Sequence, residues 1–295
     1  MPPERPKVET RLARLKVAVT GQRGFIGRYM IAALQSLNVT PVCIEDDVRS
    51  PGSWTEAFDL LFHLAAAMPQ RFGPDPGEGF SVNVGGTLSA LEACRVRGAR
   101  MVFTSTCGVY DPSVGGAISE ECPVAPATPY AQSKLMAEML CRSYADHFGV
   151  SSTVLRLFNV YGAGQNPTFL IPYLVRCALE GREAVVHHPE SSRDFVHAGD
   201  VAQALMCAAF HEGSFETFNI GMGQPHTVRE VLETIGQVIG APVAWEQGEG
   251  GPDPHPSVYA DIGQAEAHLG WRPAVRLEEG LREVVNAMRS GRHDS

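Results

Sequence analysis

The chain has 295 residues, of which 44% are hydrophobic and 19% charged, as in an ordinary globular protein with a large core. Its 24 basic and 33 acidic side chains give a net charge of −9 without a block of Lys and Arg, which argues against a nucleic-acid or anionic-membrane partner. No apolar run approaches the ~20 residues of a membrane span, and residues 1–16 lack the apolar core of a signal peptide. We therefore expect a cytoplasmic protein.

Residues 1–13 are rich in proline and charge, and we expect them to form a flexible tail. From Leu15 onward, short aliphatic runs alternate with longer amphipathic ones, a pattern typical of βαβ units and a parallel sheet. The pattern predicts strands near 15–20, 41–45, 60–65, 101–106 and 152–157, and helices near 25–37, 80–97, 129–148 and 168–180.

Beyond residue 165, proline- and glycine-rich stretches interrupt shorter elements. We expect an α/β fold in which residues 14–165 form a Rossmann-type doubly wound parallel sheet and residues 166–295 mainly form a smaller C-terminal lobe. A helix at 198–211 and a strand at 215–221 are expected to return to the main body.

Cysteine and histidine patterns predict no metal site. The seven cysteines are scattered and include no CxxC pair, so reduced thiols are favoured over disulfides or structural zinc. The adjacent pair His187 and His188 would point to opposite faces of a strand, and we treat it as structural.

Three glycines, Gly21, Gly24 and Gly27, follow the first strand directly and open a helix. Such a turn brings backbone N–H groups and a helix N-terminus against a pyrophosphate, where any Cβ would hold the ligand off. The alternative is a glycine turn needed only for packing.

An acidic cluster, Glu45 to Asp47, lies about 20 residues beyond the glycines, at the end of the second predicted strand. An acid there accepts hydrogen bonds from the adenosine ribose and repels a 2′-phosphate, which favours NAD over NADP. Arg23 and Arg49 leave open an approach to a phosphate.

Tyr130 and Lys134 are four residues apart on a predicted helix, so both face the same way. An ammonium beside a phenol lowers the phenol pKa from about 10 toward the range of a general base. Upstream, the strand near 101–106 ends in a cluster of hydroxyls that would border a cofactor crevice. Taken alone, such a Tyr/Lys pair is usually only a helix face.

The chain resembles the extended short-chain dehydrogenases/reductases in a series of short segments that occur in the order typical of that group. These are TGQRGFIG, LLFHLAA, NVGGT, FTSTCGVY, YAQSK, LRLFNVYG, RDFVHAGDVAQA and YADIGQAEAHLGW. The resemblance is to the NAD-dependent sugar epimerase/dehydratase family, in particular its UDP-glucose 4-epimerase-like members, and it spans Leu15 to about Val285.

The resemblance implies that Tyr130 is the catalytic acid/base, that Lys134 contacts the nicotinamide ribose, and that Thr106 bonds the reacting oxygen. It also implies NAD as cofactor, a nucleotide-sugar substrate contacted by Asn159 and Arg193, and a set of further cofactor-binding residues. These are Gly21, Gly24, Phe25, Ile26 and Gly27 at the pyrophosphate, Glu45 at the adenosine ribose, Asp47 and Val48 at the adenine, and Leu64, Ala65 and Ala66.

The chain departs from the family at three points. Cys107 and Gly108 stand where 4,6-dehydratases carry an Asp and a Glu, which disfavours that elimination; small residues there are similar to the 4-epimerases. Cys107 as an acid/base group in an unusual elimination stays an alternative. Gly251 stands where the family commonly has a phosphate-binding Arg. The interval between Glu45 and the next predicted strand is short, so we expect the additional strand that the family has in this interval to be vestigial.

The favoured function is therefore an NAD-dependent nucleotide-sugar epimerase that works through a 4-keto intermediate. The alternatives are a keto-sugar reductase or atypical dehydratase in deoxysugar biosynthesis, and a non-catalytic NAD-binding module. We also expect a homodimer formed through helices 80–97 and 129–148, because Leu135, Met136, Met139 and Leu140 exceed what one helix needs for its own sheet. The alternative is that all four are intramolecular core.

Overall fold

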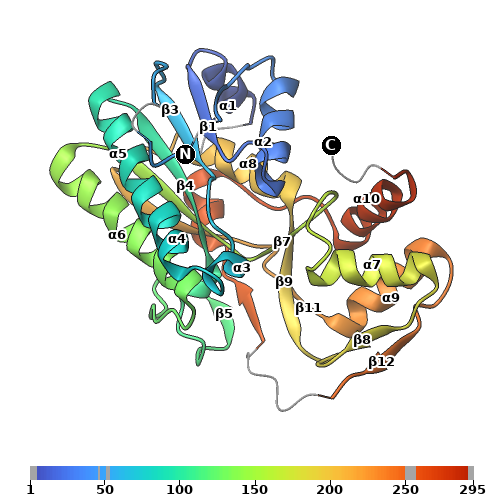
Figure 1. Ribbon diagram of the computed structural model, residues 1–295. Coiled ribbons are helices and arrows are strands. Elements are labelled where there is room, and N and C mark those ends of the chain that lie inside the picture. Colours follow the sequence, from blue (N-terminus) through green and yellow to red (C-terminus); the bar gives the residue numbers. More distant parts are fainter. Residues whose placement is uncertain (1–4, 46, 51–53, 250–256, 292–295) are drawn as a thin grey trace.

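A six-stranded parallel sheet forms the centre of the protein in the computed structural model, which describes residues 5–45, 47–50, 54–249 and 257–291 (Figure 1). The strand order is β10-β6-β4-β3-β1-β2, and every neighbouring pair is parallel. The strands are β1 (Val17–Thr20), β2 (Val42–Ile44), β3 (Leu60–His63), β4 (Arg100–Thr106), β6 (Ser152–Leu157) and β10 (Phe215–Ile220). Most of their residues are buried because both faces of the sheet are covered.

Helices cover both faces of this sheet, which confirms the doubly wound fold. Residues of α1 (Arg5–Leu12), α2 (Phe25–Ser36) and α8 (Ala198–Ala208) share one apolar core with the strands. Residues of α5 (Gly86–Arg97) and α6 (Pro129–Phe148) share the other. Two short helices, α3 (Pro69–Phe72) and α4 (Pro76–Phe80), and a π-helical turn, Ser81–Gly85, precede α5.

The N-terminal segment differs from the expected flexible tail. Residues 5–12 form α1, and its Val8 and Leu12 side chains are buried beside α8. The guanidinium carbon of Arg11 lies 4.1 Å from the centre of the Phe210 ring. Proline and charge content concealed two apolar residues spaced i,i+4, which is enough to dock a short helix.

The second body is a smaller lobe around a sheet of order β11-β9-β13-β5, with β7 paired to β9 and β12 paired to β8. Its core lies among α7, α9 and α10. Its strands are β5 (Gly116–Ile118), β7 (Asn159–Tyr161), β8 (Ala184–Val186), β9 (Ser192–His197), β11 (Pro225–Thr227), β12 (Trp245–Gln247) and β13 (Val258–Ala260). Its helices are α7 (Leu170–Glu180), α9 (Val228–Ile239) and α10 (Leu277–Arg289).

The chain crosses between the two bodies more than once. β10 pairs with β6 in the main sheet, whereas β5 pairs with β13 in the lobe. A single boundary at residue 165 therefore does not separate them. The described residues between Ile44 and Leu60, 47–50 and 54–59, hold no strand, so β2 is the edge of the sheet.

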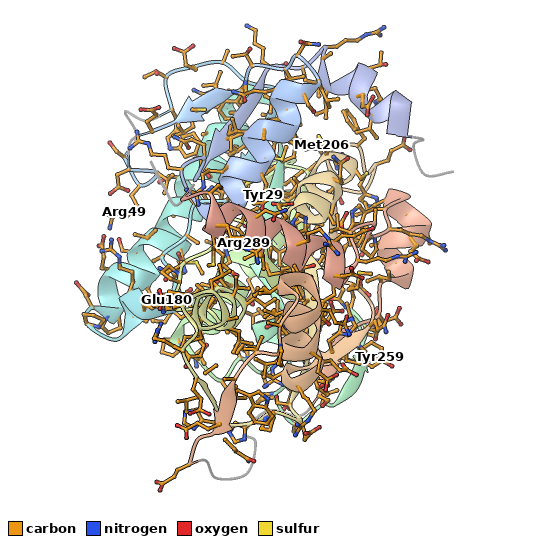
Figure 2. All side chains as sticks on the ribbon, turned by 90° about the vertical axis from the view of Figure 1, so that its right-hand side faces the viewer. Tyr29, Arg49, Glu180, Met206, Tyr259 and Arg289 are labelled. Carbon is orange, nitrogen blue, oxygen red and sulfur yellow. The ribbon has the colours of Figure 1, made fainter. Side chains whose placement is uncertain are left out.

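The cofactor-side helix α2 is also tied to the end of the chain. The Tyr29 hydroxyl donates to Glu283 Oε1 of α10 over 2.6 Å, and Figure 2 shows Tyr29 beside the helix that carries Arg289. His187 and His188 follow β8 rather than lying on a strand, so the alternation argument does not apply to them. The Nδ1 atom of His187 lies 2.8 Å from the Glu249 carbonyl oxygen.

Candidate active site

A cleft of about 1100 Å³ opens at the carboxyl ends of the parallel strands. β1 and β3 are neighbours, but the chain leaves β1 toward β2 on one side and continues from β3 toward β4 on the other. The loops diverge at such a point, and ligands of open α/β sheets bind there. All of the site residues that the sequence predicts within the described chain line this one cleft, from Gly21 to Arg193.

The glycine turn is built by close backbone packing. Gly21 has φ +70°, and a Cβ there would lie 2.6 Å from the Ala65 nitrogen. A Cβ on Gly27 would lie 2.1 Å from the Gly21 oxygen, whereas one on Gly24 meets only that oxygen, at 3.1 Å. The expectation that all three glycines make room for a ligand is thus wrong for Gly21 and Gly27. At these two positions a Cβ would collide with the protein's own backbone.

The N-terminus of α2 is suited to hold an anion. Its first turn comprises Phe25, Ile26 and Gly27, and no side chain caps it in the described structure. Gly24, Phe25, Ile26 and Gly27 all line the cleft. Unpaired N–H groups at the positive end of a helix dipole bind phosphates, so this turn fits the pyrophosphate of a dinucleotide.

A buried hydrogen-bond chain fixes the turn, and sequence reasoning missed it. The Thr20 hydroxyl oxygen accepts from the N–H groups of Leu64 and Ala65, over 3.1 and 3.2 Å. Its own hydrogen is then left for His63 Nδ1, 2.8 Å away, and His63 Nε2 donates to Thr87 Oγ1 over 3.2 Å. Burial lowers the pKa of His63 to about 3, so the ring is neutral with its hydrogen on Nε2. The signal was present, since Thr20 and His63 are register partners on adjacent strands.

At the end of the cleft near β2, Arg23 and Arg49, the two arginines that could approach a phosphate, both form ion pairs with acidic side chains. The carboxylate of Glu45 pairs with Arg23 at 2.7 Å, and Arg49 pairs with Asp47 and, at 2.7 Å, with Glu78. Hydrogen bonds from Arg49 lower the pKa of Asp47 to about 2. Figure 2 labels Arg49 at one edge of the molecule. Glu45, Asp47 and Val48 therefore line this end of the cleft together. Asp46 lies outside the described residues.

Thr106, Tyr130 and Lys134 come together at the middle of the cleft. Thr106 ends β4, and its hydroxyl oxygen accepts from the Gly108 N–H at 3.1 Å. Tyr130 lies in the first turn of α6, which Thr128 caps through the Ala131 N–H. A helix starting at this threonine carries the phenol and the ammonium on one face, one turn apart.

Burial sets the ionisation of this pair. It raises the pKa of Tyr130 to about 12 and lowers that of Lys134 to about 8. The expected lowering of the phenol pKa by Lys134 is therefore wrong for the protein alone, because loss of hydration outweighs the cation. The Lys134 ammonium lies 4.2 Å from the Phe103 ring centre and has no hydrogen-bond partner among the described residues. A ribose hydroxyl would supply the missing acceptor.

The substrate side of the cleft is carried by the lobe. Asn159 Nδ2 donates to the Asp194 carbonyl oxygen over 3.2 Å, and Arg193 lies on β9 with its Nη1 2.7 Å from the Ser192 carbonyl oxygen. The Asp194 carboxylate accepts from three backbone N–H groups, those of Met222, Gly223 and Ala260. Gly251, the position of the expected arginine, lies outside the described residues.

The Cys107 thiol is buried. It packs against the core around Val109 and Phe158, and burial raises the pKa of the thiol to about 12. A thiol that stays protonated near neutral pH is a poor base.

Asn83, which sequence reasoning did not assign, joins the loop after β3 to α6. Its side chain accepts from Ala67 N–H at 2.7 Å and donates to Ser133 Oγ at 2.9 Å.

Comparison with known proteins places the fold and the cleft in one family. The model of the NAD dependent epimerase/dehydratase family matches residues 17–221. The chain is 31% identical to a UDP-glucose 4-epimerase of Mycolicibacterium smegmatis, covering 79% of this chain and 76% of that protein. It is 30% identical to a GDP-6-deoxy-D-mannose reductase of Pseudomonas aeruginosa, covering 92% and 96%. The structure of a UDP-glucose 4-epimerase from Thermotoga maritima with UDP-glucose superposes with a TM-score of 0.86 at 26% identity, covering 94% and 100%.

The chain belongs to the NAD-dependent epimerase/dehydratase family, and its cofactor is NAD. Its members are enzymes that act on nucleotide sugars, and they include both epimerases and reductases. No helix of the described residues is long and apolar enough to cross a membrane.

The glycine geometry predicts opposite outcomes for two alanine substitutions. Gly27→Ala should destabilise the fold by about 1–3 kcal/mol or more, because its Cβ overlaps backbone. Gly24→Ala should leave the melting temperature within a few degrees but weaken NAD binding about tenfold, ~1.4 kcal/mol, because its Cβ meets only the Gly21 oxygen and Gly24 lines the cleft. Thermal melts and NAD titrations of both variants check this; equal destabilisation by the two would contradict it.

Proposed function

We propose that the protein is an NAD-dependent 4-epimerase of a nucleotide-activated sugar. The observation that carries the proposal is the composition of the cleft centre. The Thr106 hydroxyl, the Tyr130 phenol and the buried Lys134 ammonium line the cleft, while Cys107 and Gly108 provide no acid/base pair for an elimination. A redox-neutral inversion needs only one proton-transfer group beside the cofactor.

The phenol of Tyr130 is placed to remove and return the proton of the sugar C4 hydroxyl, and the Thr106 hydroxyl to hold the same oxygen. Thr106 accepts from Gly108 N–H and also bonds to the Cys107 sulfur, and rotation of its hydroxyl turns the hydrogen toward a bound sugar oxygen. NAD, when bound, supplies the hydride acceptor and donor at C4. The positive charges of Lys134 and of an oxidised nicotinamide both favour the phenolate, against the effect of burial.

The remaining proposed cofactor-binding residues all line the same cleft. We propose the α2 turn with Leu64, Ala65 and Ala66 at the pyrophosphate and its neighbouring ribose, Glu45 at the adenosine ribose, and Asp47 with Val48 at the adenine. Asn159 and Arg193 are proposed to contact the substrate diphosphate. Inversion at C4 also needs the keto sugar to present both of its faces to the cofactor.

Incubation of the purified protein with UDP- and dTDP-hexoses, without added reductant, tests the proposal. We expect interconversion of at least one pair of C4 epimers. The reductase relative favours a second candidate, a 4-keto-sugar reductase built on the same Tyr130 and Lys134. Failure to interconvert any pair, with stoichiometric loss of NADH absorbance on a 4-keto sugar, would replace the epimerase by that reductase.

Substitution of the proposed acid/base separates chemistry from cofactor binding. Tyr130→Phe should lower turnover by about 10²–10⁴-fold while NAD affinity stays close to that of the parent protein. Lys134→Ala should impair both, because the ammonium serves the phenol and the ribose. NAD titration and initial rates measure the two effects, and near-normal turnover by Tyr130→Phe would refute the assignment.

We further propose a homodimer through α5 and α6. Met136 and Met139 of α6 are 46% and 65% exposed, and Leu88 of α5 is 41% exposed. Leu135 and Leu140 instead pack inward, so the expected apolar excess is smaller than four residues. An exposed apolar stripe across two adjacent helices is typical of an interface.

Sedimentation tests the dimer. The protein should sediment as a dimer at micromolar concentration, and Met136→Glu with Met139→Glu should yield monomers with an unchanged melting profile in dilute solution. A monomer before substitution would overturn this prediction. Val185→Glu, which charges an equally exposed position of the lobe, is the control.

A further inference from the structure

Lys134 is a deeply buried cation. It is 2% exposed, and its ammonium lies 4.2 Å from the centre of the Phe103 ring rather than against a carboxylate. The charged and titratable groups around it are few. His63 of β3 is neutral, Cys141 and Tyr130 of α6 have pKa values raised by burial, and Glu138 lies one helical turn further along α6. An ammonium in such a place loses its proton easily unless a negative charge supports it.

The Glu138 carboxylate supplies a negative charge near Lys134, and two buried partners, Arg156 and Ser105, fix its position. Glu138 is 4% exposed, and its carboxylate forms an ion pair with Arg156 of β6 at 2.7 Å. Its Oε1 also accepts the hydroxyl hydrogen of Ser105, the residue before Thr106 on β4. The Arg156 guanidinium lies 4.9 Å from the Tyr110 ring. Because Arg156 compensates the charge of Glu138, the carboxylate persists in the core beneath the catalytic groups.

We propose that Glu138 is a positioning residue that keeps Lys134 in its cationic form and, through Ser105, fixes the end of the strand that carries Thr106. The carboxylate and the ammonium are i,i+4 neighbours on the buried face of α6, where charge interactions are weakly screened. Loss of the negative charge should release the Lys134 proton at lower pH and so remove the cation from the site in the neutral range. The catalytic consequence rests on the proposed function, whereas the protonation of Lys134 does not.

The sequence permits a direct measurement, because it contains three lysines, Lys7, Lys16 and Lys134. Lysine labelled with ¹³C at Cε and ¹⁵N at Nζ gives three NMR signals in the full-length protein. Lys7→Arg and Lys16→Arg each remove one reference signal and assign the third to Lys134. We expect its midpoint in the parent protein near the pKa of about 8 that burial sets.

The test variant is Glu138→Gln, which removes the negative charge and keeps Arg156. We expect the Lys134 midpoint to fall by about one pH unit or more. Because Arg156 is then buried without its partner, a second variant, Glu138→Gln with Arg156→Met, guards against misfolding. In it we expect a smaller fall, since loss of the Arg156 cation offsets part of the change. Glu278→Gln, which breaks an exposed i,i+4 pair with Arg282 on α10, should leave the Lys134 midpoint unchanged.

The rate profile provides the second readout. In Glu138→Gln the alkaline limb of kcat/KM should move down by the same interval as the Lys134 midpoint, with activity partly recovered toward pH 6.5. A folded Glu138→Gln variant whose Lys134 midpoint equals that of the parent would overturn the proposal and reduce Glu138 to a packing role. If only the double variant folds, a midpoint at or above that of the parent would overturn it. A shifted midpoint without epimerase activity in any variant would keep the proposal and reject the proposed function.

Discussion

The contact between the turn after β1 and the start of the loop after β3 is the constraint on which the site depends. Gly21 lies against the Ala65 backbone so closely that no Cβ fits, and Thr20 ties both segments to the neutral ring of His63. This contact aims the N-terminus of α2 into the cleft and fixes where a pyrophosphate can lie. In the proposed function, the nicotinamide end lies among residues from β4 and α6, because both elements line the same cleft beside β3.

Burial gives the central pair its chemical character. The same desolvation raises the pKa of the Tyr130 phenol and lowers that of the Lys134 ammonium, so each group is moved toward its neutral form. A phenol with a pKa of about 12 is protonated near neutral pH, so little phenolate is present to act as the base. In the proposed function, proton removal therefore depends on nearby positive charge, which we propose that Lys134 provides with the support of Glu138.

Local patterns predicted the parts of the fold that depend on local chemistry. The glycine spacing, the i,i+4 relation of Tyr130 to Lys134, and the aliphatic runs placed the strands and the cleft within a few residues. The sequence did not reveal α1, since two buried apolar residues among charges are a weak signal, nor the crossing of β5 into the lobe. The sign of the Tyr130 pKa shift was also missed, because burial is a property of the assembled fold. The roles of the individual cleft residues stay predictions.

Transfer of the sugar hydrogen tests the central claim most directly. The NAD-loaded protein should be given the sugar nucleotide it epimerises, labelled with deuterium at C4, in ordinary water and without added cofactor. The account predicts that the deuterium stays at C4 of the inverted product, because the hydride leaves and returns within one closed cleft while only the hydroxyl proton passes through Tyr130. Loss of the deuterium to solvent, or product formation that requires added NADH, would contradict it.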